Sequence, residues 1–181
     1  MSSMSLSILR STNSSISLII SALFWYVELM INCTAIIDTR EQRPVTLEFK
    51  KGLVMKSEPG TLYTGDYSLK GFQNLVAIER KSIDDLMGCI GTQRERFERE
   101  IIRLKGYEVK ALVVESTWAK IEKGDYRSRV NPSAAIGTLM GWIAEGIPVC
   151  MADNHKRAGV FIARMLYITA RRYQLRLKAI S

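Results

Sequence analysis

Two carboxylates and a lysine stand at the ends of neighbouring apolar segments, in a pattern that suits metal-assisted hydrolysis. Asp66 opens one such segment, and Glu79 and Lys81 close the next one along the chain. If the two segments pair as a hairpin, Asp66 and Glu79 come within reach of one divalent ion. Mg²⁺ prefers hard oxygen ligands, commonly one or two carboxylates together with water and phosphate oxygens. The backbone carbonyl of Ile78 is a further candidate ligand.

The lysine lies where it can assist such an ion. Lys81 follows Glu79 by two positions, and residues i and i+2 of a strand point to the same face. A metal polarises a phosphoryl oxygen and acidifies a bound water, while a lysine orients the water and stabilises negative charge. The three residues therefore predict hydrolysis of a phosphodiester.

A sheet is needed to hold these side chains, and the remaining sequence predicts one. Helices are expected at 82–105, 133–145 and 155–177, and 58–60 has the Glu-Pro-Gly composition of a turn. Strands alternating with helices favour an α/β fold with a mixed sheet covered on both sides. The predicted strands are 34–38, 45–49, 51–55, 67–69, 75–78, 110–114 and 147–151.

Length and composition limit the class of protein. The 181 residues, 47 % of them apolar, are enough for one domain with a sizeable core and marginal for two. A balance of 26 basic against 18 acidic residues gives a net charge of +8, which is typical of proteins with a polyanionic partner, usually nucleic acid. The three cysteines fit no zinc motif, and the single His155 argues against a zinc enzyme or a Ser-His-Asp hydrolase. We expect reduced thiols and a cytoplasmic location.

Residues 1–30 differ from the rest and are left out of the fold argument. Eight of the first seventeen residues are serine, and an apolar run interrupted by Glu28 follows at 16–31. That run is shorter than the roughly twenty residues of a bilayer span, and a single arginine is too little for a signal peptide. The readings that remain open are a mispredicted start near Met30, a loosely attached helix and, least favoured, a membrane anchor. The domain itself is expected at 31–181.

The charged positions together carry a recognisable signature. Gly-Asp at 65–66 is followed by Glu-Arg-Lys-x-x-x-Asp at 79–85, and Asp-Thr-Arg-Glu stands upstream at 38–41. This pattern resembles the ERCC4-type nuclease domain of the XPF and Hef flap endonucleases, within the PD-(D/E)XK superfamily. The resemblance extends through the later strands and helices and covers about 34–175.

The resemblance implies both a fold and an activity. The fold is a restriction-endonuclease-like three-layer sandwich, with a mixed central β-sheet flanked by helices. The activity is that of a DNA endonuclease that depends on Mg²⁺ or Mn²⁺. Asp66 and Glu79 would be metal ligands, Asp38 a supporting or second ligand, and Lys81 the catalytic lysine.

The resemblance also assigns supporting roles. Arg80 would hold the site or a phosphate, and Asp85 would cap the following helix or lock Arg80 and Lys81 in place. Glu41, which ends the upstream motif, would support the site. Five arginines are candidate DNA contacts, although alternating charges on a helix commonly serve only solvation. They are Arg94, Arg99 and Arg103 in the predicted helix and Arg127 and Arg129 in the loop before Asn131.

The chain departs from the larger family members in having no room for helix-hairpin-helix modules or a helicase. A compact stand-alone nuclease of the kind found in phage or bacterial genomes is the expectation, acting on branched or junction DNA. A homodimer through the helices at 133–145 and 155–177 is a further expectation. No small-molecule cofactor and no membrane association are expected. The alternative function is a catalytically silent DNA-binding or scaffold subunit, against which the complete motif argues.

Overall fold

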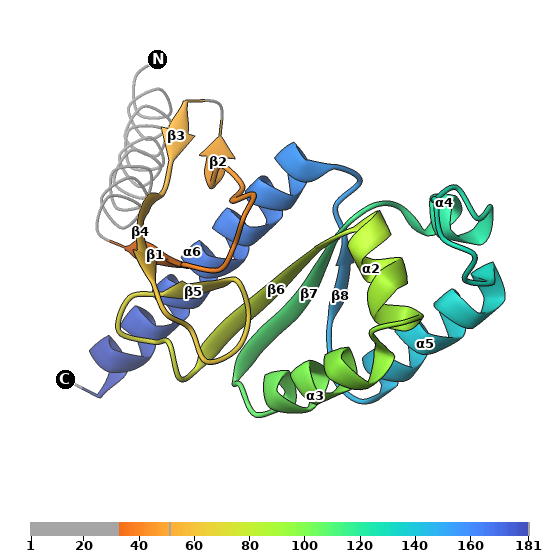
Figure 1. The fold of residues 1–181 in the computed structure, drawn as a ribbon. Coiled ribbons are helices and arrows are strands. Elements are labelled where there is room, and N and C mark those ends of the chain that lie inside the picture. The colour runs from red at the N-terminus through yellow and green to blue at the C-terminus, as the bar shows by residue number, and fades with distance from the viewer. Residues whose placement is uncertain (1–32, 51, 181) are drawn as a thin grey trace, which may run out of the picture.

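The computed structural model describes residues 33–50 and 52–180, which are built around a six-stranded mixed sheet (Figure 1). The strand order is β4-β1-β5-β6-β7-β8. β1 pairs in parallel with β4, β5 runs antiparallel to β1 and β6, and β6, β7 and β8 run parallel. The bounds are β1 Thr34–Asp38, β4 Lys56–Gly60, β5 Tyr67–Leu69, β6 Val76–Ser82, β7 Val109–Glu115 and β8 Val149–Met151. A separate two-stranded ribbon consists of β2 (Glu48–Lys50) and β3 (Leu53–Val54).

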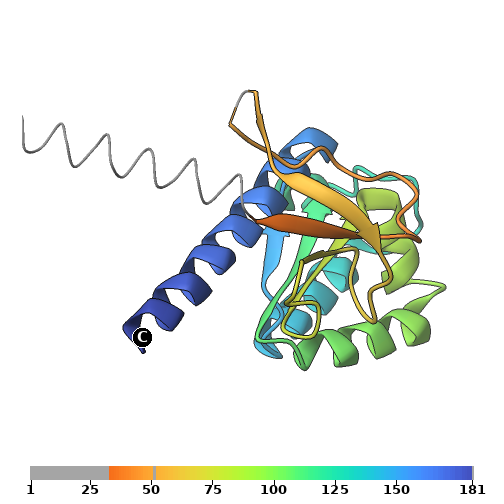
Figure 2. The same cartoon turned by 90° about the vertical axis from the view of Figure 1, so that its left-hand side faces the viewer.

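Helices cover both faces of the sheet, which gives three layers. The long helix α6 (His155–Ala179) lies along one face, as Figures 1 and 2 show. On the opposite face lie α2 (Ile83–Ile90), α3 (Arg94–Lys105) and α5 (Pro132–Ala144). The short helix α4 (Trp118–Glu122) joins β7 to α5. The predicted three-layer α/β architecture with a mixed sheet is thereby confirmed.

The two faces of the central strand β6 feed two separate hydrophobic cores. Val76 and Ile78 pack in the core beneath α6, whereas Ala77 packs in the core beneath α2, α3 and α5. This is the alternation expected of a pleated strand. Because the alternation has a period of two, it also fixes the face on which each following residue of β6 emerges.

Two element predictions are wrong for identifiable reasons. Residues 58–60 form part of β4 rather than a turn; Pro59 is tolerated there because β4 is an edge strand, where a missing N–H need not break a ladder. The helix predicted at 82–105 is divided into α2 and α3 at Gly91, which leaves the helical conformation. A Cβ at Gly91 would lie 3.2 Å from both the Met87 carbonyl oxygen and Val130 Cγ2, so a larger residue would crowd the break. The five-residue α4 was not predicted, since one turn shows no periodicity.

The expectations for residues 1–30 lie outside the described residues. Within 33–50 and 52–180, no helix combines the length and the apolar character that a bilayer crossing requires.

Candidate active site

The site forms where β5 and β6 separate. The only paired positions of these two strands are Tyr67 and Ile78. One residue further along, the Asp66 N–H donates to the Ile78 carbonyl oxygen over 2.8 Å. The next free donor on β6, the Arg80 N–H, is taken by the Asp66 carboxylate at 2.7 Å. The side chain of Asp66 therefore continues the ladder, and the strands open around it.

Glu79 and Lys81 emerge together on the face covered by α2 and α3. They follow Ala77 at intervals of two, and the Lys81 Nζ lies 2.5 Å from Glu79 Oε1. The same Nζ lies 5.3 Å from the ring centroid of Phe97 on α3, in a cation–π contact. Glu79 is 5 % exposed, so its charge is held in a poorly solvated place. The sequence motif thus brings Asp66, Glu79 and Lys81 into one cluster.

The electrostatics of this cluster favour a cation. Burial and repulsion from Glu79 raise the pKa of Asp66 to about 7. Burial also raises the pKa of Glu79, against the attraction of Lys81. The pKa of Lys81 is raised as well, because its attraction to Glu79 outweighs the opposing effect of burial. Two carboxylates and one ammonium leave the cluster short of positive charge.

The donor set fits a hard divalent ion. Asp66 and Glu79 offer carboxylate oxygens, which are the ligands that Mg²⁺ and Mn²⁺ prefer. Within the described part of the chain, no three acidic, histidine or cysteine side chains converge closely enough to hold a metal by themselves. Mg²⁺ usually keeps several waters and is bound through one or two carboxylates plus substrate phosphates, so a pair of carboxylates is compatible with it.

Asp38 lies beside this cluster but is engaged elsewhere. Its backbone N–H donates to the Asp66 carbonyl oxygen at 2.8 Å. Its carboxylate accepts hydrogen bonds from Arg40 Nε at 2.7 Å and from the Leu62 N–H at 2.7 Å. Although burial acts to raise the pKa of Asp38, these hydrogen bonds outweigh it and lower the pKa. Asp38 positions the strand and loop around Asp66, and its role as a metal ligand stays a prediction.

Arg80 points to the opposite face of β6 from Glu79 and Lys81. Its guanidinium donates to Glu41 Oε1 at 2.9 Å and to Glu115 Oε1 at 2.6 Å. Its side chain is 9 % exposed. Of the two predicted roles, these contacts fit that of holding the site, because they tie the 39–41 segment, β6 and β7 together. His155, the first residue of α6, extends the network with Nδ1 2.7 Å from Glu115 Oε1.

Two further predicted residues have defined contacts. Asp85 supports Ser82, the N-cap of α2: the Asp85 N–H donates to Ser82 Oγ at 3.2 Å and the Ser82 hydroxyl donates to Asp85 Oδ2 at 2.6 Å. These contacts fit the helix-capping alternative. The Ile78 carbonyl oxygen accepts the Asp66 N–H, and its role as a metal ligand stays a prediction.

The five arginines predicted to contact DNA lie in two places, on α3 and in the loop before α5. Arg94 and Arg99 are exposed, and Arg94 lies 3.8 Å from Glu98. Arg103 is half-buried and paired with Glu100. In the loop, Arg127 and Arg129 are both exposed. The loop adjoins the start of α2, because the Arg127 N–H donates to Asp84 Oδ1 at 3.4 Å.

Sequence reasoning missed several residues that shape the site. Glu100 on α3 lies within electrostatic reach of Glu79 and of Arg40. Its position three residues after Phe97, on the edge of the buried face of α3, was the available signal. Glu115 ends β7 and His155 begins α6, and neither position alone indicates a role in the site. Glu115 and His155 join the network around Arg80 only because β6, β7 and α6, which are distant in sequence, come together in the fold.

A mixed six-stranded sheet between two helical layers, with an acid, a second acid and a lysine at its divergence point, defines the restriction-endonuclease-like class of α/β domains. The chain belongs to the ERCC4 domain family: the sequence model of the ERCC4 domain matches residues 37–165, more than half of the chain. No curated protein matches it.

Solved structures agree on the fold. XPF from Aeropyrum pernix superimposes with a TM-score of 0.60 and 21 % identity, over 75 % of this chain and 61 % of that one. XPF from Aeropyrum pernix in complex with DNA gives a TM-score of 0.60 and 22 % identity, over 77 % of this chain and 66 % of that one. The chain therefore spans less than two thirds of each of these relatives.

Proposed function

We propose that the protein is a Mg²⁺- or Mn²⁺-dependent DNA endonuclease that hydrolyses phosphodiester bonds. The observation that carries the proposal is the cluster of Asp66, Glu79 and Lys81, in which Glu79 is buried and the pKa of Asp66 is raised to about 7. Membership of the ERCC4 domain family and the fold of the XPF–DNA complex support DNA as the substrate. The net charge of +8 supports a polyanionic substrate as well.

Each residue of the cluster has a separate part in the reaction. Asp66 and Glu79 would hold the ion with their carboxylate oxygens. A bound divalent ion supplies Lewis-acid polarisation of the phosphoryl oxygen and a more acidic water. Lys81, held 2.5 Å from Glu79, can donate a hydrogen bond to a phosphate oxygen or to the attacking water. Arg80 forms ion pairs with Glu41 and Glu115, and these would keep β6 in the orientation that presents Glu79 and Lys81.

Branched or junction DNA, processed in repair, recombination or phage DNA metabolism, is the proposed substrate within this class. The support comes from the family alone, and the chain spans less than two thirds of its structural relatives. Cleavage of flap, fork, nicked and linear duplex substrates in parallel, with Mg²⁺ and separately with Mn²⁺, would rank them. Equal cleavage of all four would contradict the preference while leaving the nuclease assignment in place.

The decisive test is a charge-neutralising change at Glu79. We expect Glu79→Gln to lower the cleavage rate at least about 100-fold, with an unchanged circular dichroism spectrum. Glu95→Gln, the same chemical change at an exposed position of α3, should cleave like the wild type. A folded Glu79→Gln protein that cleaves at the wild-type rate would contradict the proposed mechanism.

The second candidate function, a catalytically silent DNA-binding or scaffold subunit, has no specific observation in its favour, since Asp66, Glu79 and Lys81 are all present and close together. It predicts salt-sensitive DNA binding without cleavage in Mg²⁺ or Mn²⁺. Cleavage assays with and without a chelator separate the two functions. Cleavage that the chelator abolishes supports the nuclease. No cleavage even before the chelator is added supports the silent subunit.

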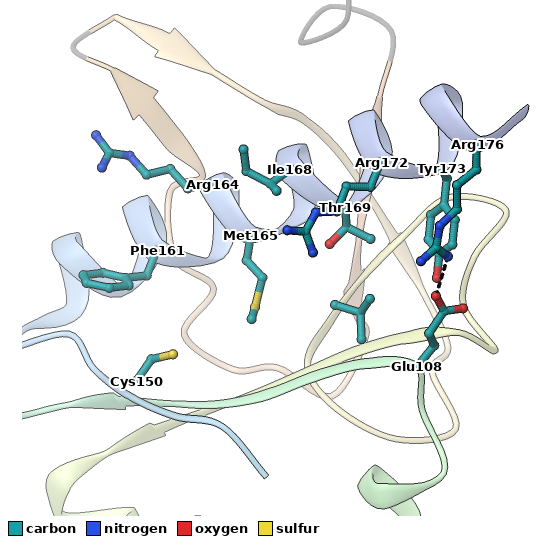
Figure 3. A pocket seen from close by; sticks show the side chains of 11 residues that line it. Glu108, Cys150, Phe161, Arg164, Met165, Ile168, Thr169, Arg172, Tyr173 and Arg176 are labelled. Atoms are coloured by element: carbon teal, nitrogen blue, oxygen red, sulfur yellow. Dashed lines mark hydrogen bonds and ion pairs between the residues drawn. The ribbon is translucent and has the colours of Figure 1, made fainter. Parts of the chain in front are cut away.

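We also propose a homodimer that uses α6. A groove of about 580 Å³ lies between α6 and the β7–β8 edge, and Figure 3 shows Phe161, Met165 and Ile168 along its helical side. Phe161 is 39 % exposed and Ile168 44 % exposed, so the groove presents large apolar side chains to solvent. At one end of the groove Glu108 accepts a hydrogen bond from Arg176 over 2.8 Å.

Mass measurement in solution tests the dimer. We expect Ile168→Asp to shift the population to monomer at a concentration where the wild type is dimeric, because a charge in an apolar interface is poorly tolerated. Ile102→Asp, at a 63 % exposed position on α3, is the matched control and should not change the mass. A monomeric wild type would rule the dimer out.

We propose residues 31–181 as the nuclease unit, with 1–30 as an extension. A shortened chain beginning at residue 31 should cleave DNA at the rate of the full chain. Fractionation of the full and shortened chains with lipid vesicles would test membrane attachment through 16–31.

A further inference from the structure

An exposed aromatic side chain lies three residues before the proposed metal ligand Asp66. Tyr63 is 77 % exposed, while its neighbours Leu62 and Thr64 are each 2 % exposed. It lies in the short segment that joins β4 to Asp66. Three residues of extended chain span at most about 11 Å, so Tyr63 lies close to the proposed metal ligand. Single exposed apolar residues are common on protein surfaces, so exposure alone does not assign a role.

The segment that carries Tyr63 is fixed on both sides. The Leu62 N–H donates to Asp38 Oδ2 at 2.7 Å, and the Leu62 carbonyl oxygen accepts from Arg40 Nη2 at 2.7 Å. After Tyr63, the Asp66 N–H and carbonyl oxygen are both bonded, to Ile78 and Asp38 respectively. Both flanks of the segment are therefore held by hydrogen bonds to the elements that build the site. Presentation of the ring from a fixed backbone lowers the entropy lost when a ligand stacks on it.

Cationic and acidic groups around Tyr63 connect it to the catalytic cluster. Tyr63 lies within electrostatic reach of Tyr107, which is also within reach of Glu100 and Arg103. Glu100 in turn lies within electrostatic reach of Glu79. Arg40, whose side chain is 68 % exposed, lies within reach of Asp66. Arg40 lines one cavity with Asp66 and Lys81, and it also holds the segment that carries Tyr63, through the Leu62 carbonyl oxygen.

We propose that Tyr63 is a substrate-positioning residue that stacks on an unpaired base next to the scissile phosphate, with Arg40 contacting the adjoining backbone. Aromatic side chains beside a basic track bind single-stranded nucleic acid through base stacking, which tolerates any sequence. A base inside a duplex is already stacked and leaves no free face for Tyr63. The contact thus favours DNA with a single-stranded segment at the cut. The inference rests on the proposed function for the place of the cut, but the stacking is measurable without cleavage.

Binding in Ca²⁺, with cleavage excluded by use of the Glu79→Gln background, tests the contact. The probes are fluorescently labelled oligo(dT), a forked duplex and a blunt duplex. We expect Tyr63→Ala to bind oligo(dT) and the fork about 10-fold more weakly, and the blunt duplex within about twofold. Tyr63→Phe keeps the aromatic face and should bind like the parent. Ile102→Ala, which removes a comparably exposed apolar side chain from α3, is the control.

The outcomes separate this inference from the nuclease assignment. Equal binding of oligo(dT) by the parent and Tyr63→Ala, at any affinity, would overturn the inference. Equal weakening on single-stranded and blunt duplex DNA would also overturn it, since stacking on an unpaired base cannot act on the duplex. Cleavage by the protein with Glu79 intact is measured separately. If that protein does not cleave DNA but still needs Tyr63 to bind oligo(dT), the inference stands and only the nuclease assignment fails.

Discussion

At the scale of single residues, the carboxyls of Asp66 and Glu79 lie in surroundings that disfavour their ionised forms. Burial disfavours ionisation of both carboxyls, and the charge of Glu79 further disfavours ionisation of Asp66. A carboxyl whose pKa is raised in the folded state stabilises the fold only while it is protonated; that contribution is lost as pH rises through the folded pKa. At neutral and alkaline pH without metal, the site therefore destabilises the protein that carries it.

This reasoning predicts that Asp66→Asn stabilises the metal-free protein. Asparagine removes the charge and keeps an oxygen for the Arg80 N–H. At pH 8.5, above the pKa of about 7, thermal unfolding should occur at least about 3 °C higher than in the wild type. The difference should shrink as pH falls from 7 towards about 4, where the unfolded carboxyl also protonates. Added Mg²⁺ should stabilise only the wild type; stabilisation of both proteins would place the ion elsewhere.

Glu41 is expected to behave in the opposite way. Burial acts to raise its pKa, but the hydrogen bonds from Arg80 and the Arg43 N–H, together with the charges of Arg80 and Lys81, outweigh burial and lower it. The stabilisation is therefore present above the unfolded pKa and is lost as pH falls through the lower folded value. Glu41→Gln should reduce the free energy of unfolding at pH 7 by about 1–3 kcal/mol. Urea unfolding at several pH values should show the wild-type advantage shrinking below about pH 4, and an advantage that grows on acidification would contradict the pairing.

Sequence spacing was sufficient to place Asp66, Glu79 and Lys81 together, because a hairpin and a period of two determine where they emerge. It was not sufficient for Asp38 or Arg80. Arg40 and Glu41, which engage them, come from a loop without regular structure. Arg80 meets Glu41 and Glu115 across 39 and 35 positions of sequence. Such pairings follow from the tertiary arrangement of three segments, which no local pattern encodes.

At the scale of elements, the β5–β6 divergence depends on the glycine that precedes Asp66. Gly65 has φ +81°, a left-handed conformation, and a Cβ there would lie 3.1 Å from both the N and the O of Ile78. A left-handed conformation costs a residue with a Cβ about 1–2 kcal/mol. The close approach adds steric strain on the hydrogen bond that joins Asp66 to Ile78.

Gly65→Ala should therefore destabilise the protein by more than its matched control. Gly71→Ala has nearly the same φ, +82°, but its Cβ would meet nothing within 4 Å. We expect a loss of about 1 kcal/mol for Gly71→Ala and at least twice that for Gly65→Ala. Only Gly65→Ala should also slow cleavage, because it displaces Asp66. Equal losses in thermal unfolding would show that backbone conformation alone, and not the approach to Ile78, requires glycine.

Most elements were predictable from apolar periodicity, and the errors have local causes. Edge strand β4 carries a Glu-Pro-Gly sequence that elsewhere marks a turn, and its strand identity comes from pairing with β1. The α2–α3 break depends on one glycine within a continuous helical pattern. For β4, pairing with β1 decided between two conformations that the local sequence permits.

At the scale of the whole molecule, the sheet separates two surfaces. The candidate catalytic cluster opens beside α2 and α3, whereas the apolar groove with its arginines lies by α6 (Figures 1 and 3). The net charge of +8 predicted a polyanionic partner, but a total charge carries no information about which face the partner meets. The fold supplies that information, because the face of β6 that bears Glu79 and Lys81 is the face covered by α2 and α3.

DNA should therefore be bound by the α2–α3 side, including the loop of Arg127 and Arg129, whose backbone adjoins Asp84 at the start of α2. Each phosphate contact contributes about 0.9 to the slope of log affinity against log salt for duplex DNA. The double change Arg127→Gln, Arg129→Gln should lower that slope by up to about 1.8. Lys56→Gln, Arg171→Gln removes equal charge from exposed positions on β4 and α6, outside the proposed dimer groove, and should leave the slope nearly unchanged. Fluorescence anisotropy between 50 and about 200 mM salt measures both. Equal slopes for the two variants would mean that net charge, and not the α2–α3 face, attracts the DNA.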